Sequence, residues 1–156
     1  MAVALFLNNI CSAHNVGAIF RTADGAGVQK IYLGGYTPAP IDRFARPQPE
    51  IVKTSLGASE TVAWQAVDSG EEVTLLQTCK ADGYQVVVVE QVSASVSLYD
   101  FVVPENVIYV LGNEVDGVVP AILEIADTII EIPMRGVKES LNVATTAGIV
   151  LFTRPH

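Results

Sequence analysis

The chain has 156 residues, half of them hydrophobic, which is a length and composition typical of one domain with a substantial core. A net charge of −8 at pH 7 argues against a protein that binds nucleic acid through overall basicity. The two cysteines, Cys11 and Cys79, lie far apart in no metal-binding or redox spacing, and this indicates ordinary reduced thiols.

The amino-terminal stretch is apolar but lacks the features of an export signal. Residues 1–15 show no basic leader and no credible cleavage site, and no later run is long enough to span a bilayer. We therefore expect a soluble, cytoplasmic protein.

Charge is distributed unevenly along the chain. Residues 1–57 carry five Lys/Arg against three Asp/Glu, whereas residues 58–156 carry four against fourteen. Four of the five early basic residues fall in a stretch rich in Pro and Gly. This stretch is either a solvated loop with ordinary surface charge or a local basic surface.

The first predicted elements are a strand and a helix. Residues 3–8 form an apolar run with a β-branched start, typical of a buried strand. Apolar residues at helical spacing follow, with Ser12 or His14–Asn15 able to cap the start of the helix. Gly25 or Gly27 can end it.

A second strand, an irregular segment and a second helix come next. Residues 30–35 predict the strand, and residues 36–50 carry four prolines, which remove donors and fix φ, so that no regular element is expected there. The structure of residues 51–64 is not predicted by any pattern. Residues 70–83 predict a helix with acids in its first turn and a lysine near its end, as the helix dipole favours.

Strands and helices alternate through the rest of the chain. Residues 84–90, 106–112 and 128–133 predict buried strands, residues 119–127 a short helix, and residues 140–152 a carboxyl-terminal helix. The strands are continuous apolar runs, which indicates burial on both sides. The predicted fold class is therefore α/β, a mostly parallel sheet with helices on both faces.

Three polar segments lie at predicted strand ends or helix starts, where open α/β sheets bind ligands. In the third of them, Ser140 and Asn142 open the last helix after a glycine-containing loop. Both residue types are favoured as helix caps, so capping alone would explain either one. A Ser-Leu-Asn triple after an Ile-Pro strand end is a more specific pattern.

The second segment places Glu114 between two glycines after a buried strand. An unpaired buried carboxylate is costly, so Glu114 needs a partner. It either caps the apolar segment that follows, pairs with an arginine, or serves a ligand site.

The first segment carries Asn15 and Arg21 on one helix. Six residues rotate a helix by about 600°, so these two side chains do not share one side of it. Arg21 sits among apolar residues and needs an anion. The anion is either Glu114 or Asp24 in an ion pair, or a phosphate or reacting group, which the guanidinium fork suits.

Together the three segments resemble the motifs of the SpoU family of RNA ribose 2′-O-methyltransferases, which belongs to the SPOUT superfamily and includes the TrmH-like enzymes. The first motif corresponds to Asn15, Gly17, Arg21 and Thr22. The second corresponds to Gly112, Asn113, Glu114 and Gly117. The third corresponds to Ile132, Pro133, Met134, Ser140, Leu141, Asn142, Val143 and Ala147.

The resemblance implies a carboxyl-terminal trefoil knot whose loops hold S-adenosylmethionine. It implies a cofactor site formed by Leu111, Gly112, Ile132, Met134, Ser140 and Leu141, with the second motif's glycine allowing the chain to turn close to the ligand. It also implies a catalytic set formed by Arg21, Asn15, Glu114, Ser140 and Asn142.

The implied roles within this set differ. Arg21 gives electrostatic help to a ribose hydroxyl, because an arginine is normally always protonated. Asn15 and Asn142 orient the ribose and Arg21, and Ser140 holds the loop or a phosphate. Glu114 fixes Arg21 or a motif asparagine in place.

The expected substrate is tRNA or rRNA, and the expected assembly is a homodimer without metal. Arg21, Arg43, Arg46 and Lys53 are the predicted RNA-binding residues. We expect residues 1–156 to be a single methyltransferase domain, with no room for an RNA-binding domain before the first motif and no long tail helix after the last.

Two other classes compete with this hypothesis. A catalytically silent RNA-binding module of the same fold is disfavoured by the intact motif residues. A nicotinamide oxidoreductase is disfavoured because no Gly-x-Gly-x-x-Gly follows the first strand.

Overall fold

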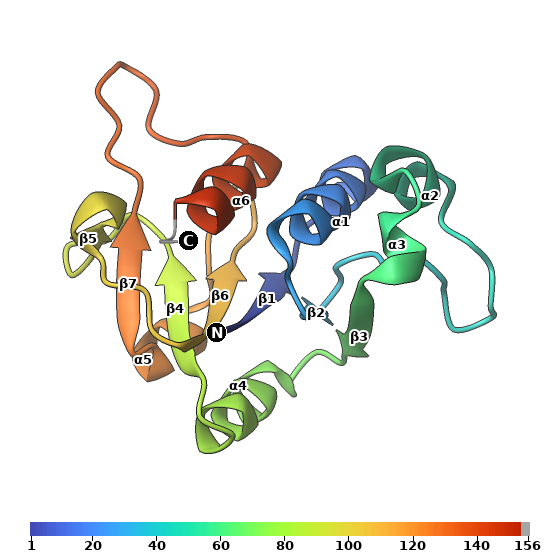
Figure 1. The fold of residues 1–156 in the computed structure, drawn as a ribbon, viewed down its shortest axis with the longest axis horizontal. Helices are drawn as coiled ribbons and strands as arrows, with labels where there is room; N and C mark the ends of the chain where they lie inside the picture. The colour runs from blue at the N-terminus through green and yellow to red at the C-terminus, as the bar shows by residue number, and fades with distance from the viewer. Residues whose placement is uncertain (154–156) are drawn as a thin grey trace.

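A parallel sheet of seven strands, in the order β3-β2-β1-β6-β4-β7-β5, forms the centre of the computed structural model, which describes residues 1–153 (Figure 1). Every pair of neighbouring strands in the sheet is parallel. The strands are β1 (Ala2–Asn8), β2 (Lys30–Gly34), β3 (Ala63–Val67), β4 (Gln85–Val89), β5 (Val96–Ser97), β6 (Asn106–Leu111) and β7 (Thr128–Glu131). The helices are α1 (Ala13–Ala26), α2 (Pro49–Ser55), α3 (Ala58–Thr61), α4 (Glu72–Ala81), α5 (Pro120–Ile125), α6 (Val143–Phe152) and the 3-10 helix η1 (Leu98–Asp100).

Helices cover both faces of this sheet. Alternate residues of β1 point to opposite sides, so Leu5 and Leu7 pack under α1, α2 and α6. Phe6 points the other way and packs with residues of α4 and α5. Figure 1 shows α1 and α6 on one side of the strands and α4 and α5 on the other. The predicted α/β class, with a mostly parallel sheet and helices on both faces, is confirmed; the trefoil knot stays a prediction.

The ends of α1 follow the predicted signals. The Ser12 hydroxyl accepts a hydrogen bond from the Asn15 backbone N–H at 3.1 Å, which satisfies one of the free donors of the first turn. At the other end, Gly27 adopts φ +72°, the left-handed conformation that commonly ends helices. These caps hold Asn15 in the first turn of α1.

Residues 51–64, for which the sequence predicted no structure, form α2, α3 and the approach to β3. Helix α2 packs along α1, and a Cβ added at Gly17 would lie 3.0 Å from the Ile51 carbonyl oxygen and closer still to the Thr54 side chain. Gly17 is therefore required for the close contact of the two helices. Strand β3 lies at the sheet edge and exposes most of its side chains, so it lacks the apolar run by which the central strands were predicted. Among the described residues, no helix is both long and apolar enough to cross a membrane.

Candidate active site

A chain of hydrogen bonds joins the three polar segments at the carboxyl edge of the sheet. The Asn142 side-chain N–H donates to Asn15 Oδ1 at 3.2 Å, and Asn15 Nδ2 donates to Glu114 Oε1 at 3.2 Å. Asn15 belongs to α1, Glu114 to the loop after β6, and Asn142 to the start of α6. The fold thus brings one residue of each predicted motif into direct contact.

Asn142 is both a helix cap and a member of this chain. Its Oδ1 accepts from the backbone N–H groups of Ala144 at 2.9 Å and Thr145 at 3.3 Å, which fixes the amide so that Nδ2 faces Asn15. The capping interpretation of Asn142 is therefore correct, and it is compatible with a place in the site. Ser140 does not cap α6 and lies in the exposed loop before it.

Asn113 holds the loop that presents Glu114, a role that the sequence did not reveal. Its side chain is buried, and Oδ1 accepts from the backbone N–H groups of Val115 at 2.8 Å and Asp116 at 2.9 Å. Its Nδ2 donates to the Asn9 carbonyl at 2.9 Å and to the Tyr36 hydroxyl at 2.7 Å. An asparagine between Gly and Glu after a buried strand is a turn signal that could have indicated this role.

Tyr36 connects the loop after β2 to the same network. Its hydroxyl also accepts from Cys11 Sγ at 3.7 Å, and this hydrogen bond is the main reason that the pKa of Tyr36 lies above its usual value. The phenol is therefore neutral at physiological pH and is a hydrogen-bonding group there. No sequence pattern marks Tyr36 as part of the site.

A hollow with a volume of about 310 Å³ lies beside this network, and we call it the first hollow. All six residues predicted to hold a cofactor line it, namely Leu111, Gly112, Ile132, Met134, Ser140 and Leu141. Four carboxylates also line it, from Glu90, Glu114, Glu131 and Glu139. The size lies at the lower end of that of small-molecule sites, and the walls combine apolar side chains with negative charge. Such a lining suits a ligand with an apolar face and a positive group.

Gly112 is required by the packing of its own loop. A Cβ added there would lie 2.5 Å from both Gly117 C and Val118 N, so the glycine lets two parts of its own loop approach each other. Glu90 holds the far side of the loop by accepting from the Val118 N–H at 3.0 Å. The prediction that Gly112 allows close approach of a ligand stays a prediction, and the structure adds a requirement of the loop itself.

Arg21 lies outside the first hollow and lines a second hollow over α1. The lining residues of this second hollow are His14, Ala18, Arg21, Thr22, Gly25, Lys53, Thr54, Leu56 and Phe152. The ion pairs present within residues 1–153 join Arg46 to Asp42 and Lys80 to Asp127. The alternative in which Arg21 pairs with Glu114 or Asp24 is therefore not found there; Glu114 accepts from Asn15, and Asp24 accepts from Thr61.

The predicted RNA-binding residues also separate in space. Lys53 lines the second hollow with Arg21, whereas Arg43 and Arg46 line neither hollow and lie on the loop between β2 and α2. In the part of the chain that the structure describes, no group of three or more His, Cys, Asp or Glu side chains is arranged to hold a metal ion.

Comparison with known proteins places this architecture in one family. Residues 2–152 match the model of the SpoU rRNA Methylase family. The chain is 35% identical over 147 residues to the 23S rRNA (guanosine-2'-O-)-methyltransferase RlmB of Neisseria meningitidis, a match that covers 94% of this chain and 55% of that relative. It is 35% identical over 148 residues to the tRNA (guanosine(18)-2'-O)-methyltransferase of Aquifex aeolicus, covering 95% of this chain and 66% of that one.

Solved structures agree with these matches. The A. aeolicus TrmH/SpoU tRNA modifying enzyme superposes with a TM-score of 0.82 at 33% identity, covering 96% of this chain and 72% of that one. The AdoMet-bound rRNA methyltransferase from Sinorhizobium meliloti superposes with a TM-score of 0.85 at 29% identity, covering 97% and 54% of the two chains. The chain spans between about half and two thirds of the length of the sequence relatives named above. From the family model, the fold and the three motif segments together, this chain belongs to the SpoU rRNA methylase family.

Proposed function

We propose that the protein transfers a methyl group from S-adenosylmethionine to a ribose 2′-hydroxyl of tRNA or rRNA. The observation that carries this proposal is the meeting of the three motif segments, through Asn15, Glu114 and Asn142, beside a hollow lined by all six predicted cofactor residues. The printed names of the relatives, which are 2′-O-methyltransferases of rRNA and tRNA, support it.

S-Adenosylmethionine fits the first hollow chemically. Leu111 and Ile132 offer apolar contact to an adenine ring, and the backbone near Gly112 offers hydrogen-bonding groups to its edge. The four carboxylates that line the hollow attract the positive charge of the sulfonium and ammonium groups. One solved neighbour of this fold is described as AdoMet-bound.

The residues of the chain supply placement and charge. The bound cofactor supplies an electrophilic methyl on a positively charged sulfur, and the transfer needs an in-line approach of the ribose hydroxyl. Asn15 and Asn142 orient that ribose, and Glu114 holds Asn15 in position. Ser140, exposed in the loop before α6, binds a phosphate or holds the loop. Arg21 stabilises the charge that develops on the hydroxyl oxygen or on a neighbouring RNA phosphate.

A homodimer completes this site by bringing Arg21 of one subunit to the first hollow of the other. In support, Arg21 lines a separate hollow of its own protomer, and two large apolar side chains beside it, Leu56 and Phe152, are 68% and 54% exposed. A second copy packed on this face buries them. Sedimentation should find a dimer, and a fully active monomer would refute the composite site.

RNA binding by Arg21, Arg43, Arg46 and Lys53 belongs to the same proposal. Two copies present two such basic sets while the acidic remainder of each chain faces away, and affinity should fall as salt rises. We place residues 1–156 as one methyltransferase domain acting in the cytoplasm, where its RNA substrates are made or used.

The test is methyl transfer from tritiated S-adenosylmethionine to bulk tRNA and rRNA. Label should survive in alkali-resistant dinucleotides, because a 2′-O-methyl group blocks alkaline cleavage of the neighbouring phosphodiester. Label confined to bases would refute the ribose assignment. Calorimetric titration that detects RNA binding but no S-adenosylmethionine binding would identify a catalytically silent RNA-binding module instead.

A further inference from the structure

The tip of the loop between β2 and α2 presents an aromatic ring to solvent between two arginines. Phe44 is 63% exposed, and the guanidinium carbons of Arg43 and Arg46 lie 4.9 Å and 5.0 Å from the centroid of its ring. In Figure 1 this loop projects at the edge of the molecule, beyond α2 and α3. In the sequence, this loop is marked only by its positive charges and its prolines.

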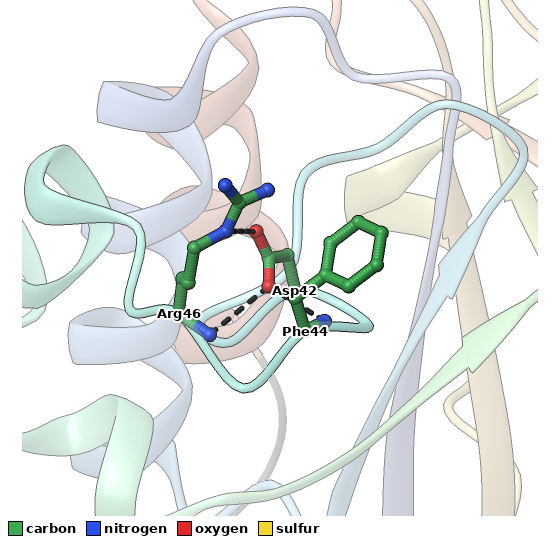
Figure 2. Close-up of polar contacts among 3 residues, drawn as sticks. All are labelled: Asp42, Phe44 and Arg46. Atoms are coloured by element: carbon green, nitrogen blue, oxygen red, sulfur yellow. Dashed lines mark hydrogen bonds and ion pairs between the residues drawn. The ribbon is translucent and has the colours of Figure 1, made fainter.

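Asp42 holds the tip in one conformation (Figure 2). Its carboxylate accepts from the backbone N–H groups of Phe44 at 2.8 Å and Arg46 at 3.0 Å, and from Arg46 Nε at 2.8 Å. These bonds, led by that of the Arg46 backbone, hold the pKa of the Asp42 carboxyl below its usual value. The backbone of Asp42 also donates to the Arg46 carbonyl at 2.9 Å, and residue 45 takes φ +59° to close the turn. The Phe44 ring therefore projects from a hydrogen-bonded turn rather than from an irregular loop without internal hydrogen bonds.

The two arginines of the tip differ in whether a carboxylate pairs with them. Arg46 is paired with Asp42 through Nε in an exposed ion pair, so it adds less net positive charge to the tip than Arg43 does. Arg43 has no carboxylate partner among the residues described; its guanidinium packs over the Phe44 ring and keeps donors that can meet a phosphate. The tip thus offers an apolar ring face, an ordered support and one uncompensated positive charge.

A single exposed aromatic residue is common on protein surfaces and by itself indicates nothing. Packing of the ring against its own arginines is the competing explanation, but 63% of the surface of Phe44 remains exposed with both arginines in place. One ring is too little apolar surface for a membrane anchor, which needs a wider apolar face. A flat aromatic ring beside a cation is the combination that single-stranded nucleic acid requires, since bases stack on the ring and phosphates meet the charge.

We infer that Phe44 is a stacking platform for one unpaired base of the substrate RNA, with Arg43 contacting a phosphate beside that base and Arg46 positioning the ring through Asp42. The inference rests on the proposed function in taking RNA as the ligand. It adds that an unpaired nucleotide is held at this tip, and it predicts tolerance of base identity, because every base has a face that can stack.

The test is binding of the full chain to a fluorescein-labelled oligouridine and to an RNA duplex of equal length, followed by fluorescence anisotropy. Phe44→Ala should weaken single-strand binding roughly 5- to 160-fold, the range expected for one lost base–aromatic stack, and should weaken duplex binding far less. Phe44→Trp should retain affinity, and its added indole should be quenched on binding. Tyr99→Ala is the matched control, because Tyr99 is also an aromatic side chain, is 65% exposed and lies on η1 away from this loop.

The salt dependence of RNA affinity distinguishes the contribution of the Phe44 ring from that of the Arg43 charge. Arg43→Ala should reduce the slope of log affinity against log salt by about 0.7, the value for one phosphate contact on a single strand, whereas Phe44→Ala should leave that slope unchanged. Equal losses on single strand and duplex, unchanged affinity of Phe44→Ala, or no measurable oligouridine binding by the parent chain would each overturn the inference. Loss of self-association in Phe44→Ala would also overturn it, by making the tip a contact between copies.

Failure of the proposed function has a different outcome. If the parent chain binds oligouridine through Phe44 but transfers no methyl group, the catalytic proposal fails and the stacking site stands. If the parent chain methylates RNA and Phe44→Ala binds oligouridine equally well, the stacking site alone fails. The parent protein and Phe44→Ala should have the same affinity for S-adenosylmethionine, since Phe44 does not line the first hollow.

Discussion

The first hollow at the carboxyl edge and the second hollow over α1 differ in how their polar side chains are held. In the first, Asn15, Glu114 and Asn142 are bonded to one another, and Asn142 is also fixed by the start of α6. In the second, Arg21 is exposed and no carboxylate within the described chain pairs with it. One sequence motif therefore places side chains on two surfaces of one helix. Asn15 is hydrogen-bonded to Glu114 and Asn142, whereas Arg21 has no carboxylate partner among the described residues.

The largest expected effect is that of removing the charge from the second hollow. Arg21→Ala should lower kcat roughly 100-fold or more, as expected for a lost electrostatic stabiliser, and should leave S-adenosylmethionine affinity unchanged. Steady-state kinetics and calorimetry on the same preparation measure both. Arg21→Lys is the matched control and should recover part of kcat, because it keeps the charge without the fork. A variant that loses cofactor binding and keeps kcat would show that the two hollows are not separate in function.

Mixing two inactive variants tests whether the hollows meet across a dimer. Gly112→Val should destroy the first hollow, because its loop has no room for a Cβ, while leaving Arg21 in place. After subunit exchange with Arg21→Ala, half of the sites in each mixed dimer have an intact hollow facing an intact arginine. Activity should recover to about a quarter of the parent value if the site is composite, given two-fold symmetry and random exchange. No recovery after verified exchange would place both parts of the site in one protomer.

A smaller effect is expected from removing one hydrogen bond of the network beside the first hollow. Glu114→Ala leaves Asn15 Nδ2 without its acceptor and should lower kcat roughly 10-fold, the scale of one hydrogen bond to a charged group. Glu114→Gln keeps an oxygen that can accept from Asn15 and should lose much less. Pre-steady-state kinetics of both variants measures the difference. Equal losses would mean that the charge of Glu114, rather than its hold on Asn15, is what the site uses.

The smallest effect concerns the opposite face of the sheet, which carries neither hollow. Burial is the main cause that raises the pKa of Tyr32 from 10.0 to about 12. The unfolded chain loses this proton near pH 10 and the folded chain does not, so stability is fully present below pH 10 and falls between about pH 10 and 12. Tyr32→Phe should reduce that alkaline loss in thermal melts and leave methyl transfer at neutral pH unchanged. A change in kcat would show that the two faces of the sheet are coupled.

Much of the fold followed from local pattern. The apolar runs that became β1, β4 and β6 predicted a buried parallel sheet, because strands covered on both faces have no polar alternation. The ends of α1 were predicted to within a few residues, as Ser12 or His14–Asn15 and Gly25 or Gly27, since caps act within one turn; the structure selects Ser12 and Gly27. Strands β3 and β5 were missed because they are short or exposed at the sheet edges.

The candidate site was predicted as a set of residues but not as an arrangement. The sequence by itself determined which side chains lie at strand ends and helix starts, and the spacing of Asn15 and Arg21 already placed them on different sides of one helix. Only the tertiary structure decided that Glu114 bonds to Asn15, 99 positions away, rather than to Arg21, and that Asn142 reaches Asn15 across 127 positions. The ordered turn that carries Phe44 could not be predicted from the sequence pattern either, since the four prolines of residues 36–50 predicted only irregular backbone. Caps and apolar periods act over a few residues, whereas these contacts depend on how distant segments are brought together by the sheet.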